Sequence, residues 1–223
     1  MAHDMYPNSP PRLTPDLLLR GYMAGIFPMA EARDDDAVFW VDPRQRGVLP
    51  LDGVHVSRKL RRFLARTEWT LSLNQDFAGV VAGCADRDET WINDQIFDAY
   101  TALHAMGFAH ALEVREDGAL IGGVYGVAIG TAFFGESMFS RRPNGSKVAL
   151  VALCAHLRRC GYTLFDTQFV TPHLATMGAV EISRDSYRAQ LRAALSAKAD
   201  LTARPLPRTP AQIRAPGPGQ PRS

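Results

Sequence analysis

Two acidic residues directly follow apolar segments that are expected to be strands. Glu136 comes directly after the expected strand 131–135, and Asp166 directly after the expected strand 162–165, with Gln168 two residues further on. Residues i and i+2 of an extended segment point to the same side, so Asp166 and Gln168 are expected to act together. A carboxylate beside an amide can hold an attacking amine and accept its proton. In the alternative interpretation, these side chains only bind loop backbone groups or cap a nearby helix.

Two segments rich in Arg and Lys indicate a second kind of chemistry, the binding of phosphate. Residues 141–147, Arg-Arg-Pro-Asn-Gly-Ser-Lys, precede an expected helix, and backbone N–H groups at a helix start bind anions. Acyltransferases of the GNAT type hold the phosphates of coenzyme A with a comparable loop. The expected helix 57–66 carries cations and no acid, at Arg58, Lys59, Arg61, Arg62 and Arg66. Solvated helix faces usually mix both signs, so this helix favours RNA over a merely solvated face.

Composition excludes several classes of protein. The chain of 223 residues is 46% hydrophobic, which is ordinary for a globular protein and excludes a disordered one. The formal net charge of +2 includes four arginines after residue 203, so the body is slightly acidic and not a general nucleic-acid binder. The histidines and cysteines show no metal-ligand spacing, and no GxxxxGK[ST] loop occurs. Without a signal peptide or a spanning segment, a soluble, cytoplasmic protein is expected.

Hydrophobic periodicity and turn residues predict the elements that position these side chains. Thr14 and Pro15 predict the start of a helix that ends before Gly25, and Asp117-Gly118 predicts a tight hairpin turn. Helices are expected at 16–23, 57–66, 76–82, 94–106, 146–159 and 184–198, and strands at 38–41, 69–73, 109–116, 119–129, 131–135 and 162–165. This order predicts an α+β fold around an antiparallel-rich mixed sheet. We expect a small N-terminal domain (1–42), a main domain (43–200) and a disordered Pro/Arg-rich tail (201–223).

Several strings, taken together, resemble one family closely. They are Arg20-Gly21-Tyr22 with Gly25-Ile26-Phe27-Pro28, Phe39-Trp40-Val41-Asp42-Pro43-Arg44, His55-Val56-Ser57-Arg58, Thr90-Trp91-Ile92, Gly122-Gly123-Val124-Tyr125-Gly126, Phe134-Gly135-Glu136-Ser137-Met138-Phe139-Ser140 and Asp166-Thr167-Gln168. The chain resembles the leucyl/phenylalanyl-tRNA–protein transferases of the bacterial N-degron pathway. The resemblance runs from about Leu13 to Tyr187.

The resemblance implies a fold and a reaction. The fold is a small N-terminal domain joined to a GNAT-like acyltransferase domain. The reaction moves Leu or Phe, less often Met, from aminoacyl-tRNA to the N-terminal Arg or Lys of a protein, which marks that protein for degradation. Aminoacyl-tRNA is already an activated ester, so no cofactor, ATP or metal is expected. The expected partners are aminoacyl-tRNA and the acceptor protein, with no DNA and no membrane.

The resemblance also implies roles for particular residues. Asp166, Gln168 and Glu136 are the expected catalytic residues, and their carboxylates also suit an acceptor that begins with a cation. The expected substrate-binding residues are Trp91, Trp40, Met29, Phe134, Met138, Ser140 and Phe169. The expected tRNA-binding residues are the five cations of helix 57–66. Many members carry tryptophan where this chain has Met29, so looser recognition of the terminal adenine is expected there.

Two other functions stay open at this point. A coenzyme A-dependent GNAT-type N-acyltransferase would use the loop 141–147, and acetyl-coenzyme A would then stabilise the protein. A non-enzymatic RNA-binding module would need only the helix 57–66. Such a module would bind RNA whether or not the RNA carries an aminoacyl group.

Overall fold

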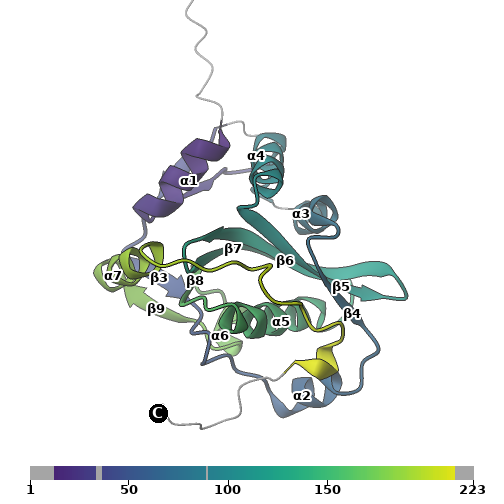
Figure 1. Ribbon diagram of the computed structural model, residues 1–223. Coiled ribbons are helices and arrows are strands. Elements are labelled where there is room, and N and C mark those ends of the chain that lie inside the picture. The colour runs from purple at the N-terminus through teal and green to yellow at the C-terminus, as the bar shows by residue number, and fades with distance from the viewer. Residues whose placement is uncertain (1–12, 34–36, 89, 214–223) are drawn as a thin grey trace, which may run out of the picture.

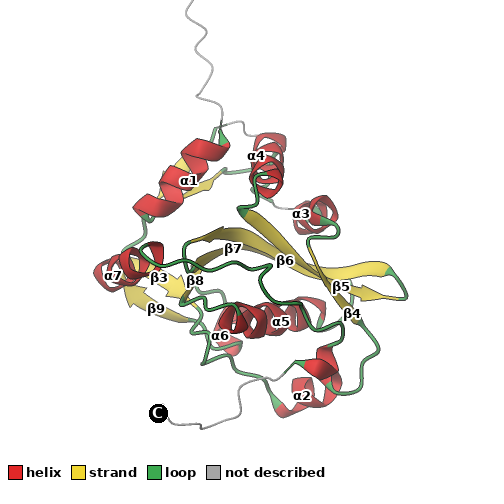
Figure 2. Cartoon of the chain, in the orientation of Figure 1, coloured by secondary structure: helices red, strands yellow, loops and turns green. Residues whose placement is uncertain are grey.

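A computed structural model describes residues 13–33, 37–88 and 90–213 of the chain. Its centre is a seven-stranded sheet in the order β4-β5-β6-β7-β8-β3-β9, with helices on both faces (Figure 1; Figure 2). The strands are β3 (Gln45–Val48), β4 (Thr70–Leu73), β5 (Ala109–Glu116), β6 (Ala119–Ile129), β7 (Ala132–Ser140), β8 (Leu164–Gln168) and β9 (Val180–Ser183). Neighbouring strands are antiparallel except β7 and β8, which are parallel. The expected α+β fold with an antiparallel-rich mixed sheet is confirmed.

Alternating side chains of the central strands build a core on each face of the sheet. Val124 of β6 belongs to the cluster formed with α5 (Gly145–Arg159). The next residue, Tyr125, belongs to the cluster formed with α3 (Phe77–Ala85) and α4 (Asp94–Ala105). Successive residues of a strand point to opposite faces, so one strand supplies both cores. Figure 1 shows α5 on one side of the sheet and α3 and α4 on the other.

A small N-terminal unit lies against α4. Its helix α1 (Pro15–Ala24) begins after Thr14, whose side chain accepts a hydrogen bond from the backbone N–H of Leu17. The helix ends at Gly25, whose φ of 83° is in the left-handed region. A hairpin of β1 (Phe27–Met29) and β2 (Phe39–Val41) follows. Tyr22 of α1 is fully buried in the same cluster as α4. The expected small N-terminal unit is therefore present, and a division between residues 42 and 43 stays a prediction.

The remaining elements are four further helices. They are α2 (Arg58–Leu64), α6 (Pro172–Thr176), α7 (Arg184–Leu195) and the 3-10 helix η1 (Pro210–Gln212). All six helices expected from the sequence are confirmed, with bounds that shift by no more than three residues. β3, β9 and α6 were not expected, because these short segments contain no apolar run that would mark an element.

Residues 201–213 correct the expectation of a tail disordered from residue 201. Leu201 is 1% exposed, and its carbonyl accepts a hydrogen bond from Nε2 of the buried His156 at 2.8 Å. The N–H of Leu71 on β4 donates to the carbonyl of Arg208 at 2.8 Å. Apolar side chains among the prolines and arginines allow this segment to pack on the body as far as Ile213. The rest of the expected tail, residues 214–223, lies outside the described residues.

Candidate active site

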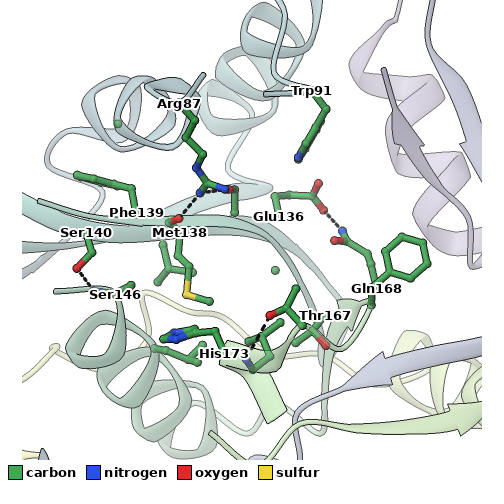
Figure 3. Close-up of a pocket in the computed structure, with 18 of the residues that line it drawn as sticks. Arg87, Trp91, Glu136, Met138, Phe139, Ser140, Ser146, Thr167, Gln168 and His173 are labelled. Atoms are coloured by element: carbon green, nitrogen blue, oxygen red, sulfur yellow. Dashed lines mark hydrogen bonds between the residues drawn. The ribbon is translucent and has the colours of Figure 1, made fainter. Parts of the chain in front are cut away.

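The candidate catalytic side chains meet where two strands diverge. β7 and β8 pair in parallel only as far as Phe134 and Asp166, and beyond that point β8 pairs with β3. Glu136 and Gln168 each lie two residues past this last pair. Nε2 of Gln168 donates to Oε1 of Glu136 at 2.8 Å (Figure 3). One hydrogen bond therefore joins the two strands across the opening between them.

A β-bulge presents Glu136 to this opening. Gly126 of β6 pairs with Gly135 of β7, and the preceding Tyr125 pairs with Ser137. Glu136 is thus the extra residue on β7, with no residue opposite it on β6. Bulges of this kind bend a strand and re-aim a side chain, and they are frequent beside active sites.

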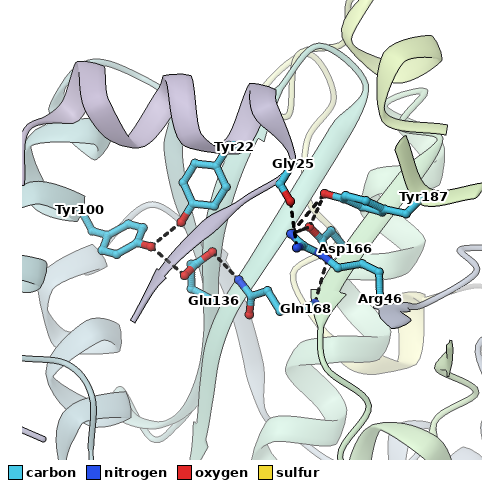
Figure 4. Close-up of polar contacts among 8 residues, drawn as sticks. All are labelled: Tyr22, Gly25, Arg46, Tyr100, Glu136, Asp166, Gln168 and Tyr187. Atoms are coloured by element: carbon cyan, nitrogen blue, oxygen red, sulfur yellow. Dashed lines mark hydrogen bonds and ion pairs between the residues drawn. The ribbon is translucent and has the colours of Figure 1, made fainter. Parts of the chain in front are cut away.

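Two tyrosines surround the carboxylate of Glu136. The hydroxyl of Tyr100 on α4 donates to Oε2 of Glu136 at 2.7 Å, and it also hydrogen-bonds to the hydroxyl of Tyr22 on α1 (Figure 4). Burial raises the pKa of Glu136 to about 7, and hydrogen bonds from the tyrosines and from Gln168 offset only part of the rise. Glu136 therefore changes its charge near neutral pH.

A buried ion pair holds Asp166 behind the cavity. Nε and Nη2 of Arg46 donate to the two carboxylate oxygens of Asp166 at 2.9 and 2.6 Å (Figure 4). Tyr187 also donates to Asp166, at 2.7 Å, and Nη1 of Arg46 donates to the carbonyl of Gly25 at 3.0 Å. The guanidinium lies 4.5 and 4.4 Å from the ring centres of Phe27 and Tyr187. Asp166 is 0% exposed, and its partners make it a structural anchor for the neighbouring backbone.

Gln168 lies in a strained turn that Asp166 supports. Its φ is 62°, and its N–H donates to Oδ1 of Asp166 at 2.8 Å. A non-glycine residue in this region costs of order 1–3 kcal/mol, so the surrounding contacts must hold it. Gly47 of β3 makes room for the turn, because a Cβ there would lie 2.6 Å from the carbonyl carbon of Phe169. The expectation that Asp166 and Gln168 point to one side is wrong, since the turn directs Gln168 to Glu136.

A cavity of about 570 Å³ opens beside the Glu136–Gln168 pair. Its apolar lining residues are Trp91, Val124, Met138, Phe139, Leu150, Phe165, Phe169 and Leu174. Arg87 also lines it, donating to the carbonyl of Met138 at 2.5 Å and to Oγ of Ser137 at 3.2 Å. Within the described part of the chain, no three His, Cys, Asp or Glu side chains gather as metal ligands. Polar side chains line the cavity as well, Glu136 and Gln168 among them, so the cavity fits an apolar side chain attached to a polar group.

The expected substrate-binding residues divide into two groups. Four of them line the cavity: Trp91, Met138, Ser140 and Phe169. Phe134 is instead a core residue, 0% exposed, with its ring centre 4.8 Å from that of Tyr22. Met29 and Trp40 lie in the β1–β2 hairpin, where Met29 pairs with Phe39 and Trp40 pairs with Pro28. Neither of them lines the cavity. A direct role of Met29 or Trp40 in the cavity therefore gains no support from the geometry.

Two of the three cations of the loop 141–147 are engaged with other partners. Nε of Arg142 lies 3.1 Å from Oε2 of Glu116, and Arg141 donates to a backbone carbonyl of β6 at 3.2 Å. Oγ of Ser140 accepts from the N–H of Ser146 at 3.1 Å, so it occupies the first turn of α5. These contacts compete with a pyrophosphate, which weakens the alternative of a coenzyme A-dependent enzyme.

The expected tRNA-binding cations lie on the outer face of α2 and just beyond its end. All five are exposed: Arg58, Lys59, Arg61, Arg62 and Arg66. Leu60 and Leu64 of the same helix are buried in the core. The ion pairs found among the described residues do not involve these cations. They are therefore available to neutralise phosphates.

Several residues around the site gave no functional signal in the sequence. Tyr100 lies four residues after the buried Ile96 on α4, so its spacing is that of a core residue. Arg46 stands in a four-residue strand without an apolar pattern, and its partner Asp166 is 120 positions away. Tyr22 and Tyr187 likewise occupy apolar helix faces. Periodicity identifies the three tyrosines as buried and cannot identify what they bind, and it gives no signal for Arg46.

Models of one protein family match most of the chain. The model described as leucyl/phenylalanyl-tRNA protein transferase matches residues 48–192, and the model of that transferase's N-terminal domain matches residues 12–44. The chain belongs to this family. A member from Cereibacter sphaeroides is 62% identical over 192 residues, which cover 86% of this chain and 90% of the relative. A member from a Jannaschia species is 57% identical over 205 residues, covering 92% and 97%. The family resemblance drawn from the sequence motifs is confirmed.

A solved structure shares the architecture at low sequence identity. The crystal structure of FemX superposes with a TM-score of 0.50 and 13% identity, covering 75% of this chain and 66% of FemX. At this identity the likeness concerns the fold alone. No helix among the described residues has the length and apolar character needed to cross a bilayer.

Proposed function

We propose that this chain transfers leucine or phenylalanine, and less often methionine, from aminoacyl-tRNA to proteins that begin with Arg or Lys. Membership of the family supports an aminoacyl-tRNA donor and a protein acceptor. The observation that carries the proposal is the Glu136–Gln168 pair at the edge of an apolar cavity. The reaction takes place in the cytoplasm, needs no cofactor, and marks the acceptor for degradation.

The cavity accommodates the side chain of the transferred amino acid. Met138, Phe139, Leu150 and Phe165 offer apolar surface to a Leu or Phe side chain. Full burial of such a side chain contributes roughly 1.5–3 kcal/mol. Trp91 at the cavity offers a surface on which the terminal adenine can stack, which is worth roughly 1–3 kcal/mol per base. The cations of α2 bind phosphates of the tRNA.

The acceptor is selected by charge. Of the two carboxylates expected to attract an N-terminal Arg or Lys, Glu136 lines the cavity and Asp166 does not. Ionised Glu136 attracts a cationic side chain, and an acceptor that begins with Ala lacks this attraction. Selectivity for Arg and Lys therefore rests on Glu136, and the exposed Asp86, which also lines the cavity, adds negative charge.

Gln168 positions the attacking amine. Its Nε2 donates to Glu136, so its Oε1 remains to accept a hydrogen bond from the α-amine. The amine nitrogen attacks the ester carbonyl, the new C–N bond forms, and the ester C–O bond breaks. The ribose oxygen leaves with the proton that the amine loses. Asp166 acts as a positioning residue through the backbone of Gln168, and orientation supplies most of the rate gain.

A transfer assay tests the proposal. Labelled Leu-tRNA is mixed with the protein and with peptides that begin with Arg, Lys or Ala, in the absence of ATP. We expect label on the Arg and Lys peptides and little on the Ala peptide. Equal labelling of all three would contradict selection by Glu136, and absence of labelling would contradict the proposed function. Inactivity of Gln168→Ala under the same conditions ties the transfer to the described site.

A further inference from the structure

A second cavity, of about 960 Å³, lies between the later half of α5 and the C-terminal segment 205–213. Ala152, Ala155 and Arg159 of α5 line it, whereas Ser146 and Leu150 of the same helix line the catalytic cavity. On a helix with 3.6 residues per turn these two sets lie on opposite faces. α5 therefore separates the two cavities, and the second cavity takes no part in the chemistry described above.

Among the described residues, arginines and no acidic side chain line the second cavity. Arg158, Arg159 and Arg208 line it, and the side chains of all three are exposed. Arg204, which directly precedes the C-terminal segment, is also exposed. The ion pairs found in the described part of the chain involve none of these arginines. Arg159 donates to the carbonyl of Pro205 at 3.2 Å, which fixes the position of one guanidinium at the rim.

The segment that carries Arg208 is firmly held. Leu201 and Pro210 are buried, His156 donates to the carbonyl of Leu201 at 2.8 Å, and Leu71 donates to the carbonyl of Arg208 at 2.8 Å. Cations on a fixed backbone lose less conformational entropy on binding than cations on a free tail. The surface is therefore ready to bind a ligand without rearrangement of the backbone.

This cationic surface borders the basic helix α2. Leu206 and Ile213 of the C-terminal segment pack against the hydrophobic cluster that contains Leu60 and Leu64 of α2. Figure 1 shows η1 next to α2 at the same end of the molecule. The C-terminal segment and α2 therefore share one core and lie at the same end of the molecule.

We propose that the second cavity is a further phosphate-binding surface for the tRNA donor, continuous with the basic face of α2. The inference rests on the proposed function, since tRNA is the polyanion that this function brings to the protein. Unpaired arginines without an acidic neighbour suit a phosphate backbone. Arg204 and Arg208 lie beyond residue 192, where the matched family model ends, so part of this surface is additional to the matched region.

Charge removal tests the inference. In Arg158→Gln/Arg208→Gln, we expect uncharged tRNA to bind about 5- to 10-fold more weakly. The slope of log affinity against log salt concentration should fall by the equivalent of one to two phosphate contacts, roughly 0.7–0.9 for each contact. The matched control Arg192→Gln/Lys198→Gln removes two exposed positive charges at the end of α7. The control should keep its tRNA affinity within about twofold. Binding is measured by anisotropy over a series of salt concentrations.

Two further measurements separate binding from folding and from catalysis. Arg158→Lys/Arg208→Lys keeps the charges and should bind tRNA with nearly the wild-type salt slope. Transfer from a short aminoacyl-adenosine donor to an Arg-starting peptide should be unchanged in the glutamine variant, because the catalytic cavity is untouched. Wild-type tRNA affinity in the glutamine variant, or equal losses in the glutamine and lysine variants, would overturn the inference. The binding assay uses uncharged tRNA and does not depend on transfer. If the protein bound tRNA but did not transfer an amino acid, the proposed function would fail and the inference about tRNA binding would still be tested.

Discussion

Nε2 of Gln168 lies 2.8 Å from Oε1 of Glu136, across the opening between β7 and β8. Each partner is fixed by a different part of the fold. Glu136 is presented by a bulge and bound by Tyr100, whereas Gln168 is held in its turn by Asp166 and Arg46. The contact therefore depends on side chains outside the cavity, and changes at Tyr100 or Arg46 should reach it.

Two substitutions of Gln168 separate its side chain from its backbone. Gln168→Ala and Gln168→Gly should both lower kcat by about 10²-fold, because both remove the amide that positions the amine. The glycine variant should be more stable than the alanine variant by about 1 kcal/mol, since the φ of 62° suits glycine. Transfer assays and urea unfolding measure the two effects. Full activity in either variant would show that the amide is dispensable.

The buried ion pair should matter more for stability than an exposed one. Arg46→Met leaves Asp166 buried without its cation, so we expect a loss of about 3–5 kcal/mol in the free energy of unfolding. Arg188 pairs with Asp42 at 2.8 Å but is half-exposed, so Arg188→Ala should cost less than about 1 kcal/mol. Urea unfolding of the two variants gives the comparison. Similar losses in both would contradict the assigned role of the buried pair.

The raised pKa of Glu136 predicts how stability depends on pH. Its pKa in the folded protein is about 7 against an ordinary value of 4.5, so between these values the folded state holds a proton that the unfolded state has lost. Stability contributed by this group therefore falls as pH rises from about 4.5 to about 7. Glu136→Gln lacks the titrating group and should show a flatter profile in this window. Parallel unfolding profiles of the two proteins would contradict the assigned burial.

Glu136→Gln should also change the use of the acceptor. Ionisation of Glu136 near pH 7 should lower KM for an Arg-starting peptide as pH rises, and this trend should be absent in the glutamine variant. The KM for Leu-tRNA should change little, because the cations of α2 are unaltered. An unchanged KM of the variant for the Arg peptide at every pH would remove Glu136 from acceptor selection.

Charge reversal on α2 tests the basic helix. Arg58→Glu/Arg61→Glu/Arg62→Glu should weaken tRNA binding by 10-fold or more, on the order expected for several lost phosphate contacts, and should lower its salt dependence. These side chains are exposed, so the thermal unfolding temperature should change little. The KM for the peptide serves as the control. A salt slope equal to that of the wild type would mean that α2 is only a solvated face.

Local signals predicted much of the fold and little of the catalytic geometry. Thr14 and Gly25 mark the ends of α1 through hydrogen bonding and backbone preference, which act within a few residues. The pairing of Arg46 with Asp166 joins strands that are 120 positions apart, and nothing near Arg46 indicates it. The side chain of Gln168 turns away from that of Asp166 because of one backbone angle.

The motifs carried more information about the family than about individual roles. They predicted the family and brought attention to Glu136, Asp166 and Gln168. They did not separate the side chains that line the cavity from those that support it, because residues of both kinds stand side by side in the same motifs, as Asp166 and Gln168 do. Residues 201–213 show a related limit, since proline and arginine content favoured disorder while Leu201 supplied an anchor.

The surroundings of Arg46 also set a time at which the site can form during synthesis. The guanidinium needs Gly25, made early, and it needs Asp166 and Tyr187, made near the end. β3 lies between β8 and β9, so both of its neighbours in the sheet are made more than 100 residues after it. The site therefore forms only after the chain as far as Tyr187 has left the ribosome.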